Sequence, residues 1–433
     1  MTVQNKSQQE CLYKPNTDIF NDMKTQSRKN QEQNQYDSEI EMHHFRTSKT
    51  KMALKSITFV AIGALMISLS ACGGGSNSTG TNDSTTVSTD VSTMDSTAGG
   101  SVDDVKPIGP APAWAPNIKP QMAAVIEKLA SYKDRPIPEL TATEARKNHT
   151  ATDAVMDVMK DNKIPTPIFN IDTVGKEIQV AGGNIHLRIY TPKTGNGPFP
   201  VIVYYHGGGF VIANIDVYDA SAKVLADQVG AVVVSVAYRL APEFKFPTAH
   251  NDSFAAYEWV VKNAASIKGD PKLIAVAGES AGGNLAVNMA IMARDKGVAA
   301  PVHVLSVYPI AGADMNTESY KKNAAAKPLD KPMMMWFSKN YLNNMAEAKD
   351  PRMNLVAANL KGLPATTIIT DEYDPLQSDG MMLADKLKAA GVKVDSKNYD
   401  GVTHEFFGMG ALVPEAKEAE TYAVDQLKKA FGK

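Results

Sequence analysis

The segment Gly278-Glu279-Ser280-Ala281-Gly282-Gly283 constrains the fold more than any other feature of this chain. It joins a short apolar run, residues 273–277, to a helical pattern over 284–294, whose apolar residues recur at the spacing of one helical face. A serine between glycines at a strand-to-helix turn is typical of a nucleophile elbow, a turn so sharp that only glycine leaves room around it. The pattern predicts that the Ser280 hydroxyl stands above a sheet, at a helix N-terminus whose dipole favours developing negative charge.

A second glycine-rich segment, His206-Gly207-Gly208-Gly209-Phe210, lies shortly after the strand-like run 200–203. Three consecutive glycines after a buried strand suit a loop that presents backbone N–H groups to an anion. In acyl-transfer enzymes such donors hold the oxyanion of the tetrahedral intermediate, and losing one typically costs about 2.7–4 kcal/mol of transition-state stabilisation. By itself the segment is also compatible with a plain turn, but its pairing with the serine elbow favours the catalytic interpretation.

A serine nucleophile needs a general base, and after the elbow the chain contains two histidines, His303 and His404. His303 lies within the apolar run 302–307, so we expect it to be a packed residue. His404 follows the strand-like segment 393–399 in a loop from which its imidazole can reach the serine. His404 is therefore the predicted base.

The acid that orients the base should follow a strand between the serine and the histidine. The run 366–370 is such a strand, and Asp371, Glu372 and Asp374 come directly after it. Spacing alone leaves all three carboxylates open. The order serine, acid, histidine along the chain matches that of the α/β-hydrolase triad.

Five motifs lie in order along the chain: His206-Gly207-Gly208-Gly209-Phe210, Tyr238-Arg239-Leu240-Ala241-Pro242-Glu243, Gly278-Glu279-Ser280-Ala281-Gly282-Gly283, Asp374-Pro375-Leu376 and Gly401-Val402-Thr403-His404-Glu405-Phe406. Through these motifs, the chain resembles the bacterial hormone-sensitive-lipase family of esterases over roughly residues 107–433. The resemblance implies that the acid is the aspartate of the Asp-Pro-Leu motif, Asp374, and that the oxyanion donors are the N–H groups of Gly208, Gly209 and Ala281. Glu279 is a departure, because many relatives carry Asp there and type-B carboxylesterases also read Gly-Glu-Ser-Ala-Gly. The intact glycine motif and the modest length of the catalytic part favour the first family.

Short apolar runs alternate with amphipathic patterns, which predicts an α/β-hydrolase fold: a mainly parallel, eight-stranded sheet with helices on both faces. By the family resemblance, the segments 116–162 and 314–350 form a helical cap over the active site. Within the second segment, the apolar stripe 331–337 either faces the acyl group or packs the cap onto the body. The expected strands are 177–180, 185–190, 200–205, 231–236, 273–277, 302–307, 365–370 and 393–399, and the expected helices are 122–132, 143–159, 221–228, 251–265, 284–294, 379–390 and 415–431.

The N-terminal part contains a pattern typical of a bacterial lipoprotein. A basic start at residue 52 is followed by an apolar run, 57–71, of 15 residues, which is shorter than the ~20 residues needed to span a bilayer. The run ends in Leu69-Ser70-Ala71-Cys72, which resembles a lipobox, so we expect residues 52–71 to be a signal peptide that is removed, and Cys72 to be lipidated. An ordinary signal peptide that ends near a cysteine is the alternative. Gly73 after the cysteine resembles the outer-membrane sorting pattern, which predicts a lipid-anchored protein of the cell envelope.

Three further segments complete the expected organisation. Residues 72–105 form a polar Gly/Ser/Thr tether, and 106–433 the catalytic domain. Residues 1–51 precede a signal that normally begins a chain, so we expect translation to start at Met52, with a cytoplasmic extension as the alternative. The balance of 45 basic against 47 acidic residues gives a net charge of −2 and no case for nucleic acid as a partner.

The predicted function is a serine carboxylesterase acting on short- to medium-chain acyl esters. Ser280 attacks the carbonyl, His404 moves the proton and Asp374 orients the imidazole, with no metal or organic cofactor required. Hydrolysis of amides, lactones or polyesters by the same triad is the first alternative. A non-catalytic ligand-binding protein on this fold is the second, and retention of all three triad residues argues against it.

Overall fold

The structure is a computed structural model that describes residues 100–433. The predicted extension 1–51, the signal peptide 52–71, Cys72 and most of the tether lie outside the described residues. Among residues 100–433, no helix is both long enough and apolar enough to cross a membrane.

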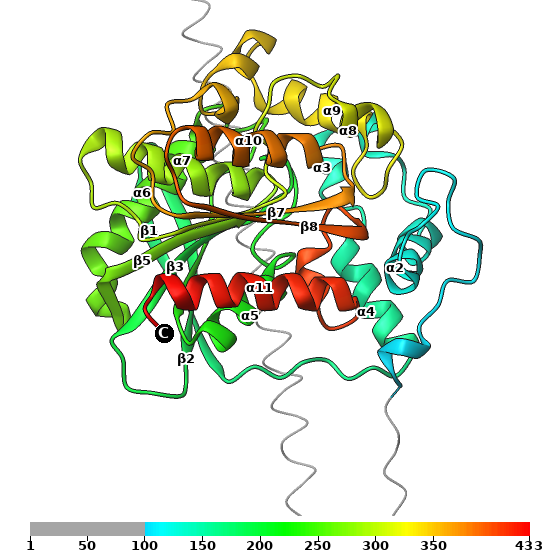
Figure 1. Ribbon diagram of the computed structural model, residues 1–433, viewed down its shortest axis with the longest axis horizontal. Coiled ribbons are helices and arrows are strands. Elements are labelled where there is room, and N and C mark those ends of the chain that lie inside the picture. The colour runs from blue at the N-terminus through cyan, green and yellow to red at the C-terminus, as the bar shows by residue number, and fades with distance from the viewer. Residues whose placement is uncertain (1–99) are drawn as a thin grey trace, which may run out of the picture. The chain divides into compact units, whose positions relative to one another are not determined.

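Eight strands form a single sheet in the order β1-β2-β4-β3-β5-β6-β7-β8 (Figure 1). β1 pairs with β2 and β2 with β4 in antiparallel register, and every other pairing is parallel. The expected eight-stranded, mainly parallel sheet is therefore confirmed. The strands are β1 Ile171–Val180, β2 Gly183–Pro192, β3 Phe199–Tyr205, β4 Val232–Ala237, β5 Gly269–Glu279, β6 Val304–Val307, β7 Thr366–Tyr373 and β8 Val394–Thr403.

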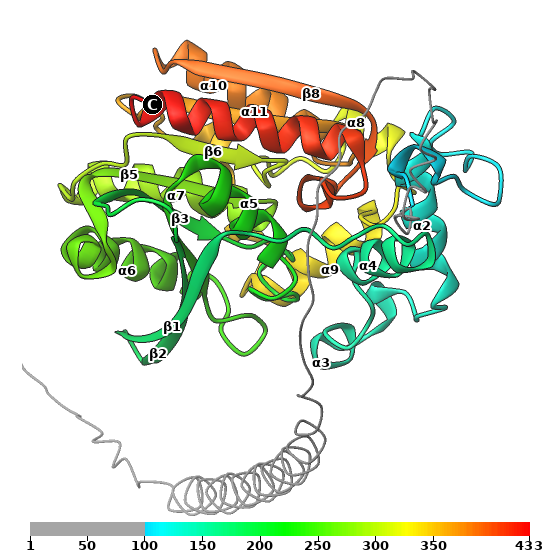
Figure 2. The same cartoon turned by 90° about the horizontal axis from the view of Figure 1, so that it is seen from below.

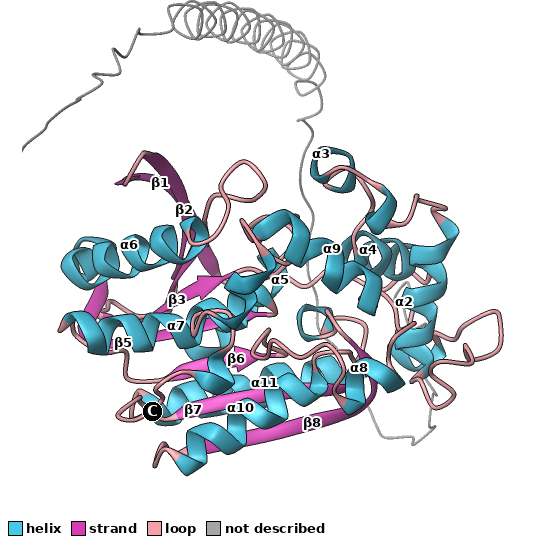
Figure 3. Cartoon of the chain, turned by 90° about the horizontal axis from the view of Figure 1, so that it is seen from above, coloured by secondary structure: helices cyan, strands magenta, loops and turns pink. Residues whose placement is uncertain are grey.

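Helices cover both faces of this sheet, as expected for a sheet whose central strands are apolar on both sides. Figure 2 shows α5 and α11 over one face, and Figure 3 shows α6, α7 and α10 over the other. β3 is buried along its whole length, with Val201 and Val203 in one core and Ile202 and Tyr204 in the other. These helices are α5 Asp219–Val229, α6 Thr248–Asn263, α7 Ala281–Lys296, α10 Gln377–Ala389 and α11 Pro414–Ala430.

The remaining helices belong to the two segments expected to form a cap, and α2, α3, α4 and α9 gather at one end of the sheet (Figures 1 and 3). The expected single helix over 143–159 is wrong, because the chain forms two helices there. Thr141 with Glu144 and Thr150 with Asp153 each make a capping box, so a new helix begins at each threonine. The helices are α2 Pro120–Ser131, α3 Ala142–Ala145, α4 Ala151–Asp161, α8 Glu318–Lys322 and α9 Lys331–Tyr341, and 3₁₀ turns lie at Val102–Asp104, Ile137–Glu139, Ala264–Ile267, Met345–Lys349, Leu355–Ala357 and Phe407–Met409.

Candidate active site

Ser280 lies in a sharp turn between β5 and α7. Its backbone adopts φ 57° and ψ −116°, a conformation that non-glycine residues rarely take. The turn closes so tightly that a Cβ added at Gly278 would lie 2.2 Å from the Gly282 carbonyl oxygen. One added at Gly282 would lie 1.9 Å from the carbonyl oxygen of Tyr205. The glycines therefore let α7 begin directly against β3, and this geometry holds the serine at the carboxyl end of the sheet.

The structure brings together Ser280, His404 and Asp374, which follow β5, β8 and β7. The His404 Nε2 atom lies 3.0 Å from the Ser280 Oγ atom, and its Nδ1 atom lies 2.7 Å from Asp374 Oδ2. The other carboxylate oxygen of Asp374 accepts a hydrogen bond from the Leu376 N–H at 2.8 Å. All three side chains are almost completely buried, at 4% exposure or less. The three groups have the spacing of a nucleophile, a base and an orienting acid.

The electrostatics of this cluster favour a protonatable imidazole. Burial by itself lowers the pKa of His404, but the charge and the hydrogen bond of Asp374 outweigh burial, with a further contribution from Glu405. The pKa of His404 is consequently raised above its ordinary value of 6.5. An imidazole beside a buried carboxylate is thus better able to hold a proton than a free histidine is.

The glycine loop lies directly beside Ser280. Gly208 and Gly209 line the same cavity and adopt φ values of 92° and 59°, in the left-handed region that favours glycine. Among residues 100–433, the N–H groups of Gly208, Gly209 and Ala281 have no hydrogen-bond acceptor. Ala281 is also the first residue of α7, where backbone N–H groups have no partner within the helix. Unpaired donors in this arrangement can receive a negatively charged oxygen.

His206 holds the glycine loop rather than facing a substrate. Its ring stacks on Tyr238 with centroids 4.3 Å apart, and its Nδ1 atom lies 2.8 Å from the Gly207 carbonyl oxygen. Burial lowers the pKa of His206 to about 4, so the ring is neutral at neutral pH. The Tyr238 hydroxyl donates to the carbonyl oxygen of His206 at 2.8 Å. His206 and Tyr238 therefore hold the glycine loop in position.

Two ion pairs fix the segment that follows Tyr238. Arg239 contacts Asp252 through two side-chain hydrogen bonds of 2.8 and 2.7 Å, and Asp252 is 1% exposed. Glu243 pairs with Arg146 at 2.7 Å, and Arg146 also donates to the Ala241 carbonyl oxygen at the same distance. Arg146 lies just after α3, so the second pair ties the segment before the sheet to the catalytic body.

Glu279, the departure noted within the elbow, is completely enclosed. It accepts hydrogen bonds from the hydroxyl groups of Tyr204 and Tyr308, which stand on β3 and directly after β6. Burial raises the pKa of Glu279 to about 7, in spite of these two donors. The longer side chain thus fills a buried polar site beneath the nucleophile.

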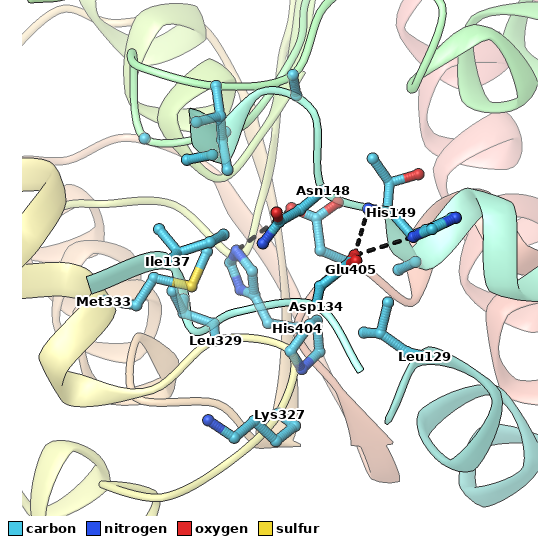
Figure 4. A pocket seen from close by; sticks show the side chains of 18 of the residues that line it. Leu129, Asp134, Ile137, Asn148, His149, Lys327, Leu329, Met333, His404 and Glu405 are labelled. Carbon is cyan, nitrogen blue, oxygen red and sulfur yellow. Dashed lines mark hydrogen bonds and ion pairs between the residues drawn. The ribbon is translucent and has the colours of Figure 1, made fainter. Parts of the chain in front are cut away.

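A cavity of about 820 Å³ opens above Ser280, within the size range of small-molecule sites. Figure 4 shows His404 and Glu405 facing this cavity together with Ile137, Leu329 and Met333. Further lining comes from α2, α4 and α9, including Met334 and Phe337 of the apolar stripe 331–337. Within that stripe, Trp336 instead packs inward and donates to the Leu140 carbonyl oxygen, and Met335 is 57% exposed. The stripe therefore divides between residues that line the cavity and Trp336, which packs inward.

Sequence reasoning missed Glu405, which directly follows the catalytic-site histidine. Its carboxylate lies 4.0 Å from His404 Nε2 and accepts a hydrogen bond from the Tyr218 hydroxyl at 2.6 Å. Burial in the cleft raises the pKa of Glu405. Its position next to His404 in the motif was the available signal, but alternation along a strand would have placed the two side chains on opposite sides. Glu405 instead adopts φ 73°, which turns its carboxylate back toward the same cavity.

The remaining sequence candidates lie apart from the serine. His303 is buried on the sheet, with Nε2 3.0 Å from the Thr367 hydroxyl oxygen. Glu372 accepts a hydrogen bond from the Gly401 N–H and does not contact the histidine. Asp371 is buried close to Asp374 and His404, but His404 is bonded to Asp374. Of the three carboxylates left open by spacing, the structure places only Asp374 against the imidazole.

Comparison with known proteins agrees with this fold. The sequence profile of the alpha/beta hydrolase fold family (Abhydrolase_3) matches residues 202–408. The chain is 31% identical to an ethyl acetate hydrolase of Pseudomonas putida over 323 residues, covering 72% of this chain and 99% of that one. It is 40% identical to the carboxylesterase NlhH of Mycobacterium tuberculosis over 252 residues, covering 57% and 79% of the two chains. A solved thermostable esterase from Pseudomonas putida, 32% identical, superposes with a TM-score of 0.67 over 73% of this chain and 98% of that one.

The fold and these matches define an α/β-hydrolase. More particularly, the chain belongs to the hormone-sensitive-lipase-like esterase family of that fold, and it is a carboxylic ester hydrolase.

Proposed function

We propose that this enzyme hydrolyses carboxylic esters through an acyl-enzyme formed on Ser280. His404 accepts the Ser280 proton as the hydroxyl attacks the ester carbonyl, and Asp374 stabilises the imidazolium that results. The negative oxygen of the tetrahedral intermediate is received by the N–H groups of Gly208, Gly209 and Ala281. His404 then protonates the leaving alcohol, and water repeats the cycle on the acyl-enzyme. The observation that carries the proposal is the continuous chain of contacts, 3.0 Å and 2.7 Å long, from Ser280 through His404 to Asp374.

The properties of the cavity support the proposal that the substrates are short- to medium-chain acyl esters. Its lining is mostly apolar, and methionine side chains such as those of Met333 and Met334 adapt to acyl groups of varied shape. The test is a panel of p-nitrophenyl esters of increasing acyl length, assayed with the wild type and with Ser280→Ala. We expect kcat/KM to fall for long acyl chains and to fall at least a thousandfold for every ester in the variant. Full activity of Ser280→Ala would overturn the assignment of the nucleophile.

We further propose that the mature enzyme is anchored in the bacterial cell envelope, at the outer membrane, by a lipid on Cys72. The lipobox-like Leu69-Ser70-Ala71-Cys72 and the polar tether after it support this proposal. The test is mass spectrometry of the mature N-terminus from the native host, with Cys72→Ser as the control. A diacylglyceryl-cysteine peptide is the expected result, and an unmodified mature N-terminus at any other residue would refute the anchor.

A further inference from the structure

Asp371 is a buried acid with no visible donor. It stands near the end of β7 and is 0% exposed. Neither of its carboxyl oxygens has a hydrogen-bond donor among residues 100–433. A buried polar group without a hydrogen-bond partner is uncommon in folded proteins and costs free energy, and a buried charge without a partner costs more.

Asp371 lies close to a second carboxylate and to the imidazole. Ligand-type atoms of Asp371, Asp374 and His404 all lie within 4.8 Å of one another. The Asp374 Oδ2 atom and the His404 Nδ1 atom are hydrogen-bonded to each other at 2.7 Å. The other titratable groups that act on this cluster are Glu405 after β8, Glu279 at the end of β5, Tyr320 on α8 and Asp379 on α10.

An ionised Asp371 would place a second negative charge beside Asp374 in a site closed to water. Two carboxylates that share a buried site do not both ionise, since burial and mutual repulsion each favour the protonated form of one of them. Only Asp374 has compensating partners, namely the Leu376 N–H and the imidazole. The proton therefore belongs on Asp371, and burial together with the charge of Asp374 raises the pKa of Asp371 well above its ordinary value.

We propose that Asp371 is a positioning residue of the esterase site, a neutral carboxylic acid whose O–H donates a hydrogen bond to the Asp374 carboxylate. The chain of contacts then runs from Asp371 through Asp374 and His404 to Ser280. The bond restrains the Asp374 carboxylate from a second side and disperses part of its charge. Because a more dispersed charge attracts the imidazolium less, Asp371 moderates how strongly His404 holds its proton.

Two substitutions of Asp371 have different consequences under this inference, which rests on the proposed role of Asp374. Asp371→Asn keeps a neutral donor of the same shape, so we expect kcat/KM within about threefold of wild type and an acid limb of the pH profile in the same place. Asp371→Leu removes the donor, so we expect kcat/KM to fall about tenfold. The acid limb should move to higher pH by on the order of half a unit, because His404 then faces the full charge of Asp374.

The matched control is Thr367→Val, on the same face of β7, which perturbs strand packing and should leave the acid limb in place. An acid limb that moves to lower pH in Asp371→Asn would show that Asp371 is ionised and would overturn the inference. So would a profile of Asp371→Leu that matches wild type. Asp374→Asn, measured alongside, separates the two proposals: if it keeps full activity the triad itself fails, whereas if it is inactive only the role of Asp371 is at issue.

A spectroscopic measurement keeps the inference testable if Asp371→Leu does not fold. The infrared difference spectrum of wild type minus Asp371→Asn at neutral pH should contain the C=O stretch of a protonated carboxylic acid. A difference spectrum with carboxylate bands in its place would contradict the neutral acid.

Discussion

Adding one methyl group at Gly282 tests how tightly the nucleophile elbow is held. The Cβ of an alanine there would lie 1.9 Å from the Tyr205 carbonyl oxygen and 2.7 Å from that of His206. Both neighbours are backbone atoms near the carboxyl end of β3, so neither can rotate away. Contacts below 3.0 Å are essentially absent for real Cβ atoms, and α7 must therefore move away from β3 by at least about 1 Å.

That displacement has a predictable effect on catalysis. Ser280 and the Ala281 N–H move with the start of α7, while His404 is held from β8. A misplacement of about 1 Å between reacting groups can cost about a hundredfold in rate, and overpacking typically costs 1–3 kcal/mol of stability. We therefore expect kcat/KM of Gly282→Ala for p-nitrophenyl butyrate to fall about a hundredfold, with a loss of about 1–3 kcal/mol in the free energy of unfolding.

The matched control lies at the other end of the same helix. Gly297 has φ 65° and no atom within 4 Å of an added Cβ, so an alanine there meets only the cost of the left-handed conformation, about 1–2 kcal/mol. Gly297→Ala should lose stability but keep its kcat/KM. If Gly282→Ala stays within threefold of wild type in kcat/KM, the tight packing of α7 against β3 does not position Ser280.

Three further outcomes follow from the charges of the described residues. Because Asp374 holds the pKa of His404 above 6.5, kcat/KM should fall as the pH drops through a midpoint above 6.5; a pH profile with a lower midpoint would contradict the pairing. Glu279 has a folded-state pKa of about 7 against an ordinary 4.5, so the folded protein keeps a proton that the unfolded chain releases, and this group's contribution to stability declines as the pH rises from 4.5 to 7. Glu279→Gln should remove this pH dependence. In urea titrations, the free energy of unfolding of the variant minus that of wild type should therefore increase by about 3 kcal/mol between pH 4.5 and 8. A difference that does not change with pH would count against the raised pKa of Glu279. Arg239→Met leaves Asp252 buried without its guanidinium partner and should cost about 3–5 kcal/mol of stability, measured by the same titrations; a loss below 1 kcal/mol would show that the pair does not hold this loop.

The parts of the site that sequence could predict are those in which local chemistry dictates geometry. The Ser280 turn and the Gly208-Gly209 loop are short segments in which glycine is required by the backbone itself, and φ values of 92° and 59° in the loop agree with that requirement. The sheet could also be predicted from the sequence, because alternating apolar strands and amphipathic helices have few arrangements that bury the apolar surfaces of both.

The parts that sequence could not supply depend on the direction of side chains brought together by the fold. Asp371 and Asp374 are three residues apart, and spacing alone did not tell which one faces His404. The structure decides this because Asp371 is still within β7, whereas Asp374 lies in the loop beyond it. The Glu405 side chain faces the cavity because its backbone adopts a left-handed conformation, which no local sequence motif predicted. The break between α3 and α4 could have been predicted, because Thr150 and Asp153 have the spacing of a capping box. The helical periodicity of residues 143–159 favoured a single helix instead.

Formation of a covalent acyl-enzyme on Ser280 can be tested by labelling the enzyme with an alkyl fluorophosphonate and mapping the adduct by mass spectrometry. The predicted result is one phosphonyl group per molecule on the peptide that contains Ser280, with loss of esterase activity in proportion. Labelling should slow sharply in His404→Ala, because the hydroxyl then lacks its base. Complete inhibition with the adduct on any other residue, or full esterase activity in enzyme that carries the adduct on Ser280, would show that Ser280 is not the nucleophile.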